Sequence, residues 1–261
     1  MSEREDLFAG VHRVLLIQLS AIGDVLRAGS VVRAMKRRRP HMRVGMLVYS
    51  DYSEVLAGIP DLSYRHVFPN VALKRALNFA ASDEDDLRAI YEHGYVPIEE
   101  LQVRNYDLAV NFHFSTPSAY LASLSGAKKI LGMNPGPDGQ INVSGEDAFA
   151  LYDDLRSPNR LIRSSEHLAV RYHRMCGLPP DDVRLDFELP IGAPSPLPVG
   201  GRFVAIHVGA GWPEKCWPAE KWRSLISQMH GASGWTPVLF GTPVERDRNF
   251  AGVFDGLDIP V

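Results

Sequence analysis

The stretch from Val14 to Val25 constrains the fold of this chain more than any other part of it. It starts with the apolar run VLLI, passes through a short turn that contains Gly23, and enters a helix-like pattern at Asp24. An apolar run without alternation is typical of a strand covered on both faces, as in a parallel sheet. Ligands of open parallel sheets bind at the carboxyl ends of the strands. We therefore expect Asp24 to lie at a functional edge of an α/β fold.

Strand and helix patterns alternate along the N-terminal part of the chain. Such alternation requires crossover connections and predicts a parallel sheet with helices packed on it. Prolines and glycines in residues 132–145 predict a loop. The expected strands are 14–18, 43–48, 65–68, 108–112 and 129–131. The expected helices are 25–36, 51–56, 71–79, 82–93, 118–124 and 165–175.

Proline and glycine mark a boundary between two domains. They crowd residues 179–201, a composition typical of an interdomain linker. The pattern then restarts, with expected strands at 203–207 and 238–240 and expected helices at 219–229 and 243–251. We predict a Rossmann-like domain over residues 1–185, a linker over 186–201 and a partial Rossmann-like domain over 202–261. A whole domain typically needs about 100–150 residues, so we expect the second one to be incomplete.

Composition excludes several classes of protein. With 45% hydrophobic and 23% charged residues, the chain is ordinary for a globular protein, and its net charge of −3 does not favour nucleic-acid binding. Cys176 and Cys216 are too few for a disulfide framework or a zinc site. No apolar run reaches the ~20 residues of a membrane span, and the N-terminus does not resemble a signal peptide. We expect a cytoplasmic protein.

A second stretch, residues 207–218, repeats the layout of the first. Gly209 and Gly211 allow the backbone to approach a ligand, and Lys215 adds a positive charge. Pro218 suits the first turn of the helix that follows, whose dipole favours anions. This pattern predicts a diphosphate site, with a plain loop and a surface lysine as the alternative. It lacks the spacing of a Walker A loop.

Asp24 also has two interpretations. Acidic residues are favoured in the first turn of any helix, so its position alone does not establish a role. The turn before it lacks the Gly-x-Gly-x-x-Gly fingerprint of dinucleotide-binding proteins. This disfavours a nucleotide-dependent oxidoreductase or epimerase.

Four motifs, in order, resemble glycosyltransferase family 9, which contains the ADP-heptose:lipopolysaccharide heptosyltransferases. Residues 19–25, LSAIGDV, resemble the opening motif of that family. HVGAG at 207–211, followed by KCWP at 215–218, is similar to the loop of its second domain. EHL at 166–168, followed by GLP at 177–179, and FGTPVE at 240–245 resemble two further motifs.

The resemblance implies an α/β fold of the GT-B type, with two Rossmann-like domains that face a cleft. It implies an inverting transfer of a sugar, with heptose from ADP-heptose as the expected donor and no metal or other cofactor. Asp24 would then be the general base, which takes a proton from the acceptor hydroxyl. Lys215 would offset charge on the leaving diphosphate. The other implied donor-binding residues are Gly209, Ala210, Gly211 and, at the ribose, Glu245.

The implied acceptor is the lipopolysaccharide core, whose anionic groups need cationic or hydrogen-bonding partners. Lys74 and Arg75 match positions where the family tends to have basic residues, and Ser20 and His113 complete the expected acceptor side. The alternatives are a solvated helix face for the two cations and a structural role for the histidine. The basic residues 36–39 leave open a peripheral contact with the inner membrane surface.

The chain departs from the family pattern in its second domain. The family's Asp-Ser/Thr-Gly-x-x-His motif is missing, and Cys216 stands where the family often has a basic residue. We therefore expect a member that is truncated at its C-terminus, with a weakened donor site. The alternative is a remnant that binds a nucleotide or glycan without turnover.

Overall fold

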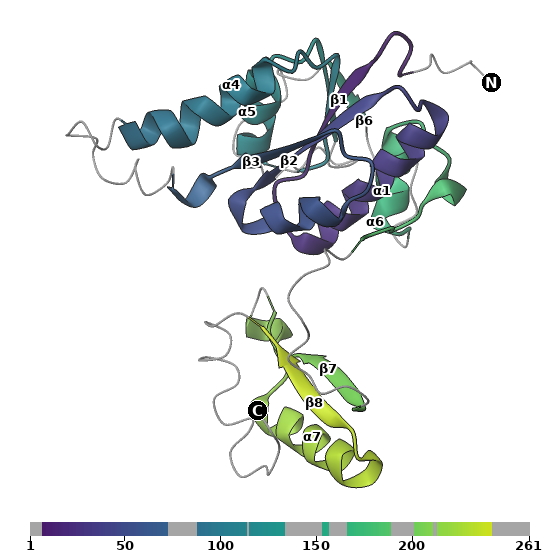
Figure 1. The fold of residues 1–261 in the computed structure, drawn as a ribbon, viewed down its shortest axis with the longest axis vertical. Helices are drawn as coiled ribbons and strands as arrows, with labels where there is room; N and C mark the ends of the chain where they lie inside the picture. The colour runs from purple at the N-terminus through teal and green to yellow at the C-terminus, as the bar shows by residue number, and fades with distance from the viewer. Residues whose placement is uncertain are drawn as a thin grey trace. The chain divides into compact units, whose positions relative to one another are not determined.

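The computed structural model describes residues 7–72, 88–113, 115–133, 153–156, 166–188, 201–210 and 213–241. The chain forms two compact units, Met1–Ile191 and Gly192–Val261 (Figure 1). The boundary between them falls within the stretch predicted as a linker. No helix of the described residues is long and apolar enough to cross a membrane.

The first unit is built on a parallel sheet, as the alternation of strands and helices predicts. Its strand order is β3-β2-β1-β4-β5-β6, and every described pairing in it is parallel. In register, Val14 lies opposite Val44 on one side and Leu108 on the other. The strands are β1 Arg13–Ile17, β2 Arg43–Tyr49, β3 Tyr64–Phe68, β4 Leu108–Asn111, β5 Lys129–Met133 and β6 Asp154–Arg156.

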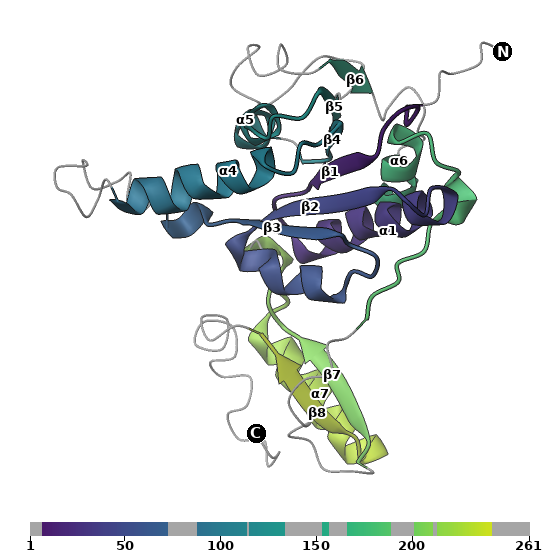
Figure 2. The ribbon, with the colours of Figure 1, turned by 45° about the horizontal axis from the view of Figure 1, so that its top comes forward.

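Helices cover both faces of this sheet (Figure 2). Successive β1 residues enter different cores: Leu16 packs in a cluster with α1 and α6, whereas Leu15 packs in a cluster with α4 and α5. This two-sided burial explains why β1 reads as a continuous apolar run. The α-helices of the unit whose bounds lie within the described residues are α1 Ile22–Arg38, α4 Val96–Gln102, α5 Thr116–Leu124 and α6 Leu168–Met175.

Several predicted elements differ from those observed. The helix predicted at 51–56 is the 3-10 helix η1, Ser50–Gly58. The helix predicted to end at residue 93 continues through the π-helix η2, Tyr91–Tyr95, into α4, whose first turn accepts Pro97. Strand β6 was not predicted, because its three residues include Asp154 and Arg156 and form no apolar run.

Some predicted elements cannot be compared with the structure. The predicted loop 132–145 begins inside β5, which extends to Met133, and its remainder lies outside the described residues. Residues 73–87, which cover most of the predicted helix 71–79 and half of the predicted helix 82–93, also lie outside them, as does the predicted helix 243–251.

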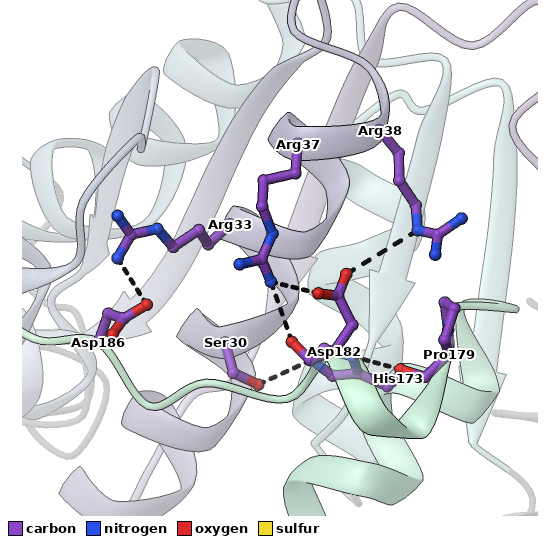
Figure 3. A network of polar contacts seen from close by, with 8 residues as sticks. All are labelled: Ser30, Arg33, Arg37, Arg38, His173, Pro179, Asp182 and Asp186. Atoms are coloured by element: carbon purple, nitrogen blue, oxygen red, sulfur yellow. Dashed lines mark hydrogen bonds and ion pairs between the residues drawn. The ribbon is translucent and has the colours of Figure 1, made fainter.

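The segment that follows α6 is fastened to α1 (Figure 3). Arg37 donates to the backbone oxygen of Asp182 at 3.1 Å and forms an ion pair with its carboxylate, and Arg33 pairs with Asp186. The 3-10 helix η5, Pro180–Asp182, lies in this segment. Further along, the Glu188 N–H donates to the Gly58 carbonyl at 2.8 Å. We call residues 179–188 the strap; it holds the chain beyond α6 against the first unit.

The basic residues 36–39 are engaged within the first unit. Lys36 Nζ donates to the carbonyls of Pro40 and Met42 at 2.9 and 3.0 Å. Arg38 Nε lies 3.9 Å from the Asp182 carboxylate, and Arg39 lies over the ring of Phe8. Cations are favoured at a helix C-terminus. These contacts give the four basic side chains partners within the first unit, so their presence in the sequence needs no contact with a membrane surface as its explanation.

The second unit contains a smaller parallel pair. Strands β7, Phe203–His207, and β8, Thr236–Phe240, flank α7, Ala219–Ser233, as the predicted restart of the pattern requires. Ile206, Val208 and Ile226 form its described core. The short 3-10 helix η6, Pro213–Lys215, precedes α7.

Candidate active site

The carboxyl ends of β1 and β4 meet at a switch in strand order. The chain crosses from β1 to β2 on one side, and β4 later adds to the other side of β1. Ligands of open α/β sheets bind outside the strands at such a point. Asp24 follows β1 and His113 follows β4, so the sheet brings these two predicted site residues to one edge.

The turn between β1 and α1 is held by the neighbouring strand. The Gln18 N–H donates to the Leu47 carbonyl at 3.1 Å, and the Tyr49 N–H donates to the Leu19 carbonyl at 3.0 Å. Ala21 then adopts φ 62° and ψ 120°, and its carbonyl accepts from the Asp24 N–H at 2.9 Å. The strained residue of the turn is thus Ala21, and the predicted turn residue Gly23 is already helical.

Asp24 lies in the first turn of α1 and forms an ion pair with Arg27. Arg27 Nη1 lies 2.5 Å from Asp24 Oδ1, and the two side chains are 36% and 31% exposed. An ion pair with this exposure contributes little to stability. The ion pair instead orients the Asp24 carboxylate through Oδ1, and the carboxylate stays accessible to a ligand.

His113 is held at the end of β4 by its own backbone. Its N–H donates to Asn111 Oδ1 at 3.0 Å, and its carbonyl accepts from Ser118 Oγ at 2.9 Å. Asn111 and Ser118 are buried and joined by a further hydrogen bond of 2.9 Å. Burial lowers the pKa of His113, and the Asp24 carboxylate acts in the opposite direction. The imidazole therefore lies within electrostatic reach of Asp24.

Gln18 connects three parts of the site. Its Nε2 lies 3.0 Å from the Ser20 carbonyl and 3.4 Å from His113 Nδ1, and Tyr172 donates to its Oε1 at 3.4 Å. Tyr172 comes from α6 and stacks on Phe112, with ring centroids 4.4 Å apart. Burial raises the pKa of Tyr172, and the Asp24 charge adds to this rise. The structure thus brings Ser20 and His113 together around Gln18, with the Asp24 carboxylate within electrostatic reach of His113 and Tyr172.

The sequence interpretation missed Gln18, Arg27 and Tyr172. Gln18 carried a signal, since it is a polar residue inside an apolar run and is only 2% exposed. Buried polar groups need partners, so a buried glutamine at a strand end indicates a polar cluster. Tyr172 carried no such signal, because its place at this edge depends on how α6 packs on α1.

The predicted donor loop follows β7 in the second unit. His207 Nδ1 lies 3.0 Å from the Gly209 carbonyl, and Val208 is buried beside Ile206. Lys215 is exposed at the end of η6, just before α7. A half-buried loop, an exposed lysine and a helix N-terminus in succession are compatible with an anion site.

Four of the remaining predicted site residues lie outside the described part of the chain, and one lies inside it. Gly211 and Glu245 on the donor side, and Lys74 and Arg75 on the acceptor side, lie outside the described residues. Ala210 lies inside them and is half-buried at the end of the loop.

Comparison with known proteins decides the family. The sequence profile of glycosyltransferase family 9 (heptosyltransferase) matches residues 97–255, more than half of the chain. The chain belongs to this family. It is therefore a glycosyltransferase, as the four motifs predict. The matched residues include the predicted donor loop and His113, whereas Asp24 lies before them. No curated protein sequence matches the chain significantly.

Solved structures show the same fold. A family 9 glycosyltransferase from Veillonella parvula matches with a TM-score of 0.70 and 18% identity, over 95% of this chain and 68% of that one. The E. coli heptosyltransferase WaaC, with ADP-2-deoxy-2-fluoro heptose, matches with a TM-score of 0.65 and 21% identity, over 94% and 73%. E. coli ADP-heptose lps heptosyltransferase II gives 0.64 and 17%, over 94% and 69%. These similarities confirm the predicted GT-B fold class.

Proposed function

We propose that this glycosyltransferase moves a heptose from ADP-heptose to a sugar of the lipopolysaccharide core, with inversion at the anomeric carbon. The observation that carries the proposal is the position of Asp24, an accessible carboxylate at the switch point of the sheet, where β4 also brings His113. Two structures of similar fold support the donor: one is named as WaaC with an ADP-heptose analogue and the other as an ADP-heptose lps heptosyltransferase.

In this proposal Asp24 removes the proton of an acceptor hydroxyl while that oxygen attacks the anomeric carbon. A new glycosidic C–O bond forms as the bond to the diphosphate breaks, and the bonding electrons leave with ADP. A carboxylate suits this role because it can accept a proton, provided that it lies within hydrogen-bond distance of the hydroxyl. The partial exposure of Asp24 supports this role, and its ion pair with Arg27 engages Oδ1 and leaves Oδ2 to accept the proton.

The second unit supplies the donor site in this proposal. The backbone of Gly209, Ala210 and Gly211 would bind the phosphates, and Lys215 would offset charge that grows on the leaving ADP. Glu245 would accept hydrogen bonds from the ribose hydroxyls. On the acceptor side, Ser20 and His113 would contact the sugar, and Lys74 and Arg75 would pair with anionic groups.

A transfer assay with ADP-heptose and heptose-deficient lipopolysaccharide tests the proposal. Asp24→Asn should lower kcat by about 10²–10⁴-fold, because the amide cannot accept the proton. The matched control is Asp51→Asn, since Asp51 is likewise an acid in the first turn of a helix and is exposed. Circular dichroism of each variant checks the fold, and the anomeric configuration of the product checks inversion.

Two outcomes would contradict the proposal. Equal rates for Asp24→Asn and wild type would remove Asp24 as the base. Titration of ADP-heptose into the wild-type chain with binding but no transfer would favour a binding protein without turnover.

A further inference from the structure

Both the NH2 group and the oxygen of the Gln18 side-chain amide make hydrogen bonds within the first unit. The atom 3.0 Å from the Ser20 carbonyl must be the NH2 group, because a carbonyl oxygen only accepts. This assignment leaves Oε1 as the acceptor for the Tyr172 hydroxyl. The second hydrogen of the NH2 group is then directed to His113 Nδ1, 3.4 Å away. The hydrogen-bond partners of the amide therefore determine which of its two end atoms is nitrogen and which is oxygen.

The orientation of Gln18 determines the tautomer of His113. A nitrogen that accepts a hydrogen bond carries no proton, so the neutral imidazole must carry its proton on Nε2. Within the described residues, no group other than Gln18 bonds to the His113 ring. Among the described residues, the charged group that acts on the ring is the Asp24 carboxylate, which is paired with Arg27 on the same helix. The Nε2–H is therefore a donor that no described residue engages, on a ring within electrostatic reach of the Asp24 carboxylate.

We propose that Gln18 is a positioning residue for sugar transfer, which fixes His113 as the Nε2–H tautomer so that this N–H donates to an oxygen of the acceptor sugar beside Asp24. The inference rests on the proposed function. A neutral histidine with Nε2–H orients the acceptor and leaves Asp24 as the base. The opposite tautomer would present a lone pair at Nε2, which would compete for the acceptor proton and repel the acceptor oxygen.

Gln18 also couples the tautomer to the fold of the site. Its partners come from three elements that are 2, 95 and 154 residues away in sequence. Polar groups in a buried network hold one another in place, because each would be costly to leave unpaired. The amide thus ties the turn before α1, the end of β4 and helix α6 into one arrangement.

The test combines nuclear magnetic resonance with kinetics on the full chain. Ring ¹⁵N shifts of His113, assigned by their loss in His113→Gln, report its tautomer in the resting protein. Wild type should show the Nε2–H form. Gln18→Leu should give a mixture of tautomers and lower kcat by about tenfold or more, since small errors of position are costly in transfer reactions. Gln18→Glu should favour a proton on Nδ1, because a carboxylate accepts there.

Two further variants keep the test informative. Gln102→Glu is the matched control, because Gln102 is exposed and its Nε2 also donates to a backbone carbonyl, that of Leu124. It should change neither the tautomer nor kcat. Tyr172→Phe retains the ring that stacks on Phe112 and removes only the donor to Gln18. It should broaden the tautomer distribution even where the Gln18 variants fail to fold.

The outcomes separate this inference from the proposed function. The inference would be overturned if His113 of the wild-type protein at neutral pH carried its proton on Nδ1, or carried two protons and a positive charge. It would also be overturned by a wild-type chain that transfers sugar, together with a folded Gln18→Leu variant that has the same tautomer and the same kcat. A wild-type chain that binds its substrates but transfers nothing would overturn the proposed function, and the inference with it.

Discussion

His66 and Tyr106 form a buried polar pair on the face of the sheet opposite α1. His66 Nε2 lies 2.7 Å from the Tyr106 hydroxyl, and their rings meet edge to face with centroids 5.9 Å apart. Gly45 makes room for this pair, since a Cβ there would lie 2.0 Å from the hydroxyl. Burial lowers the pKa of His66 from 6.5 to about 4. The folded protein therefore holds this histidine neutral where the unfolded chain would protonate it.

This shift predicts a loss of stability in mild acid. Between about pH 6.5 and pH 4 the unfolded chain binds the His66 proton and the folded chain does not, so stability falls as the pH falls. The contribution of His66 should be about 2 kcal/mol between pH 7 and pH 5. Urea unfolding of His66→Gln at both pH values should show a smaller fall than wild type, with exposed His41→Gln as control. An equal fall in His66→Gln and wild type would contradict it.

Helix α1 is the element that joins chemistry to architecture. Its first turn carries Asp24, its middle carries Ser30, whose Oγ lies 3.1 Å from His173 Nε2, and its end holds the strap. His173 in turn lies 3.3 Å from the Pro179 carbonyl. The apolar side chains of α1 pack in one buried cluster with side chains of the sheet. The strap and the proposed base are therefore attached to opposite ends of one helix.

Gly58→Ala should loosen the strap. A Cβ at Gly58 would lie 2.2 Å from the Phe187 ring and 2.6 Å from the Glu188 carbonyl, so the strap must shift. We expect a destabilisation of about 1–3 kcal/mol. Hydrogen exchange should show faster exchange at Glu188, whose N–H donates to Gly58. Gly23→Ala is the control, since its Cβ would meet only the Arg27 guanidinium at 3.5 Å. Unchanged protection at Glu188 would refute the close packing.

At the scale of the whole molecule, the two units differ in how many buried apolar residues the structure describes. The first unit buries a cluster on each face of its sheet. The described core of the second unit consists of Ile206, Val208 and Ile226. Local stability follows buried apolar contact, so the second unit should open more readily than the first.

Ile226→Ala tests this difference. Removing a fully buried isoleucine side chain should cost about 2–5 kcal/mol, a large loss for a unit whose described core has three buried residues. Hydrogen exchange should then rise in β7 and β8 and stay unchanged in β1 and β4. Val110→Ala, in the core of the first unit, is the reciprocal control. A rise of equal size in both units after Ile226→Ala would show that they unfold together.

Much of the fold was predictable because its signals are local. Apolar runs and helical spacing predicted β1, α1 and β2 to within a few residues, and the restart at β7 began at the predicted position. The prediction failed where the signal was weak. Strand β6 has three residues, two of them charged, and η1 has the apolar spacing of a helix but the hydrogen bonds of a tighter one.

The sequence by itself determined that Asp24 stands at the carboxyl end of a buried strand and that the chain carries the motifs of a glycosyltransferase. Both follow from residues close together along the chain. Only the tertiary structure decided which side chains surround Asp24. Gln18 meets His113 across 95 residues and Tyr172 across 154. Such contacts depend on strand order and on the packing of α6 against α1, which no local pattern specifies.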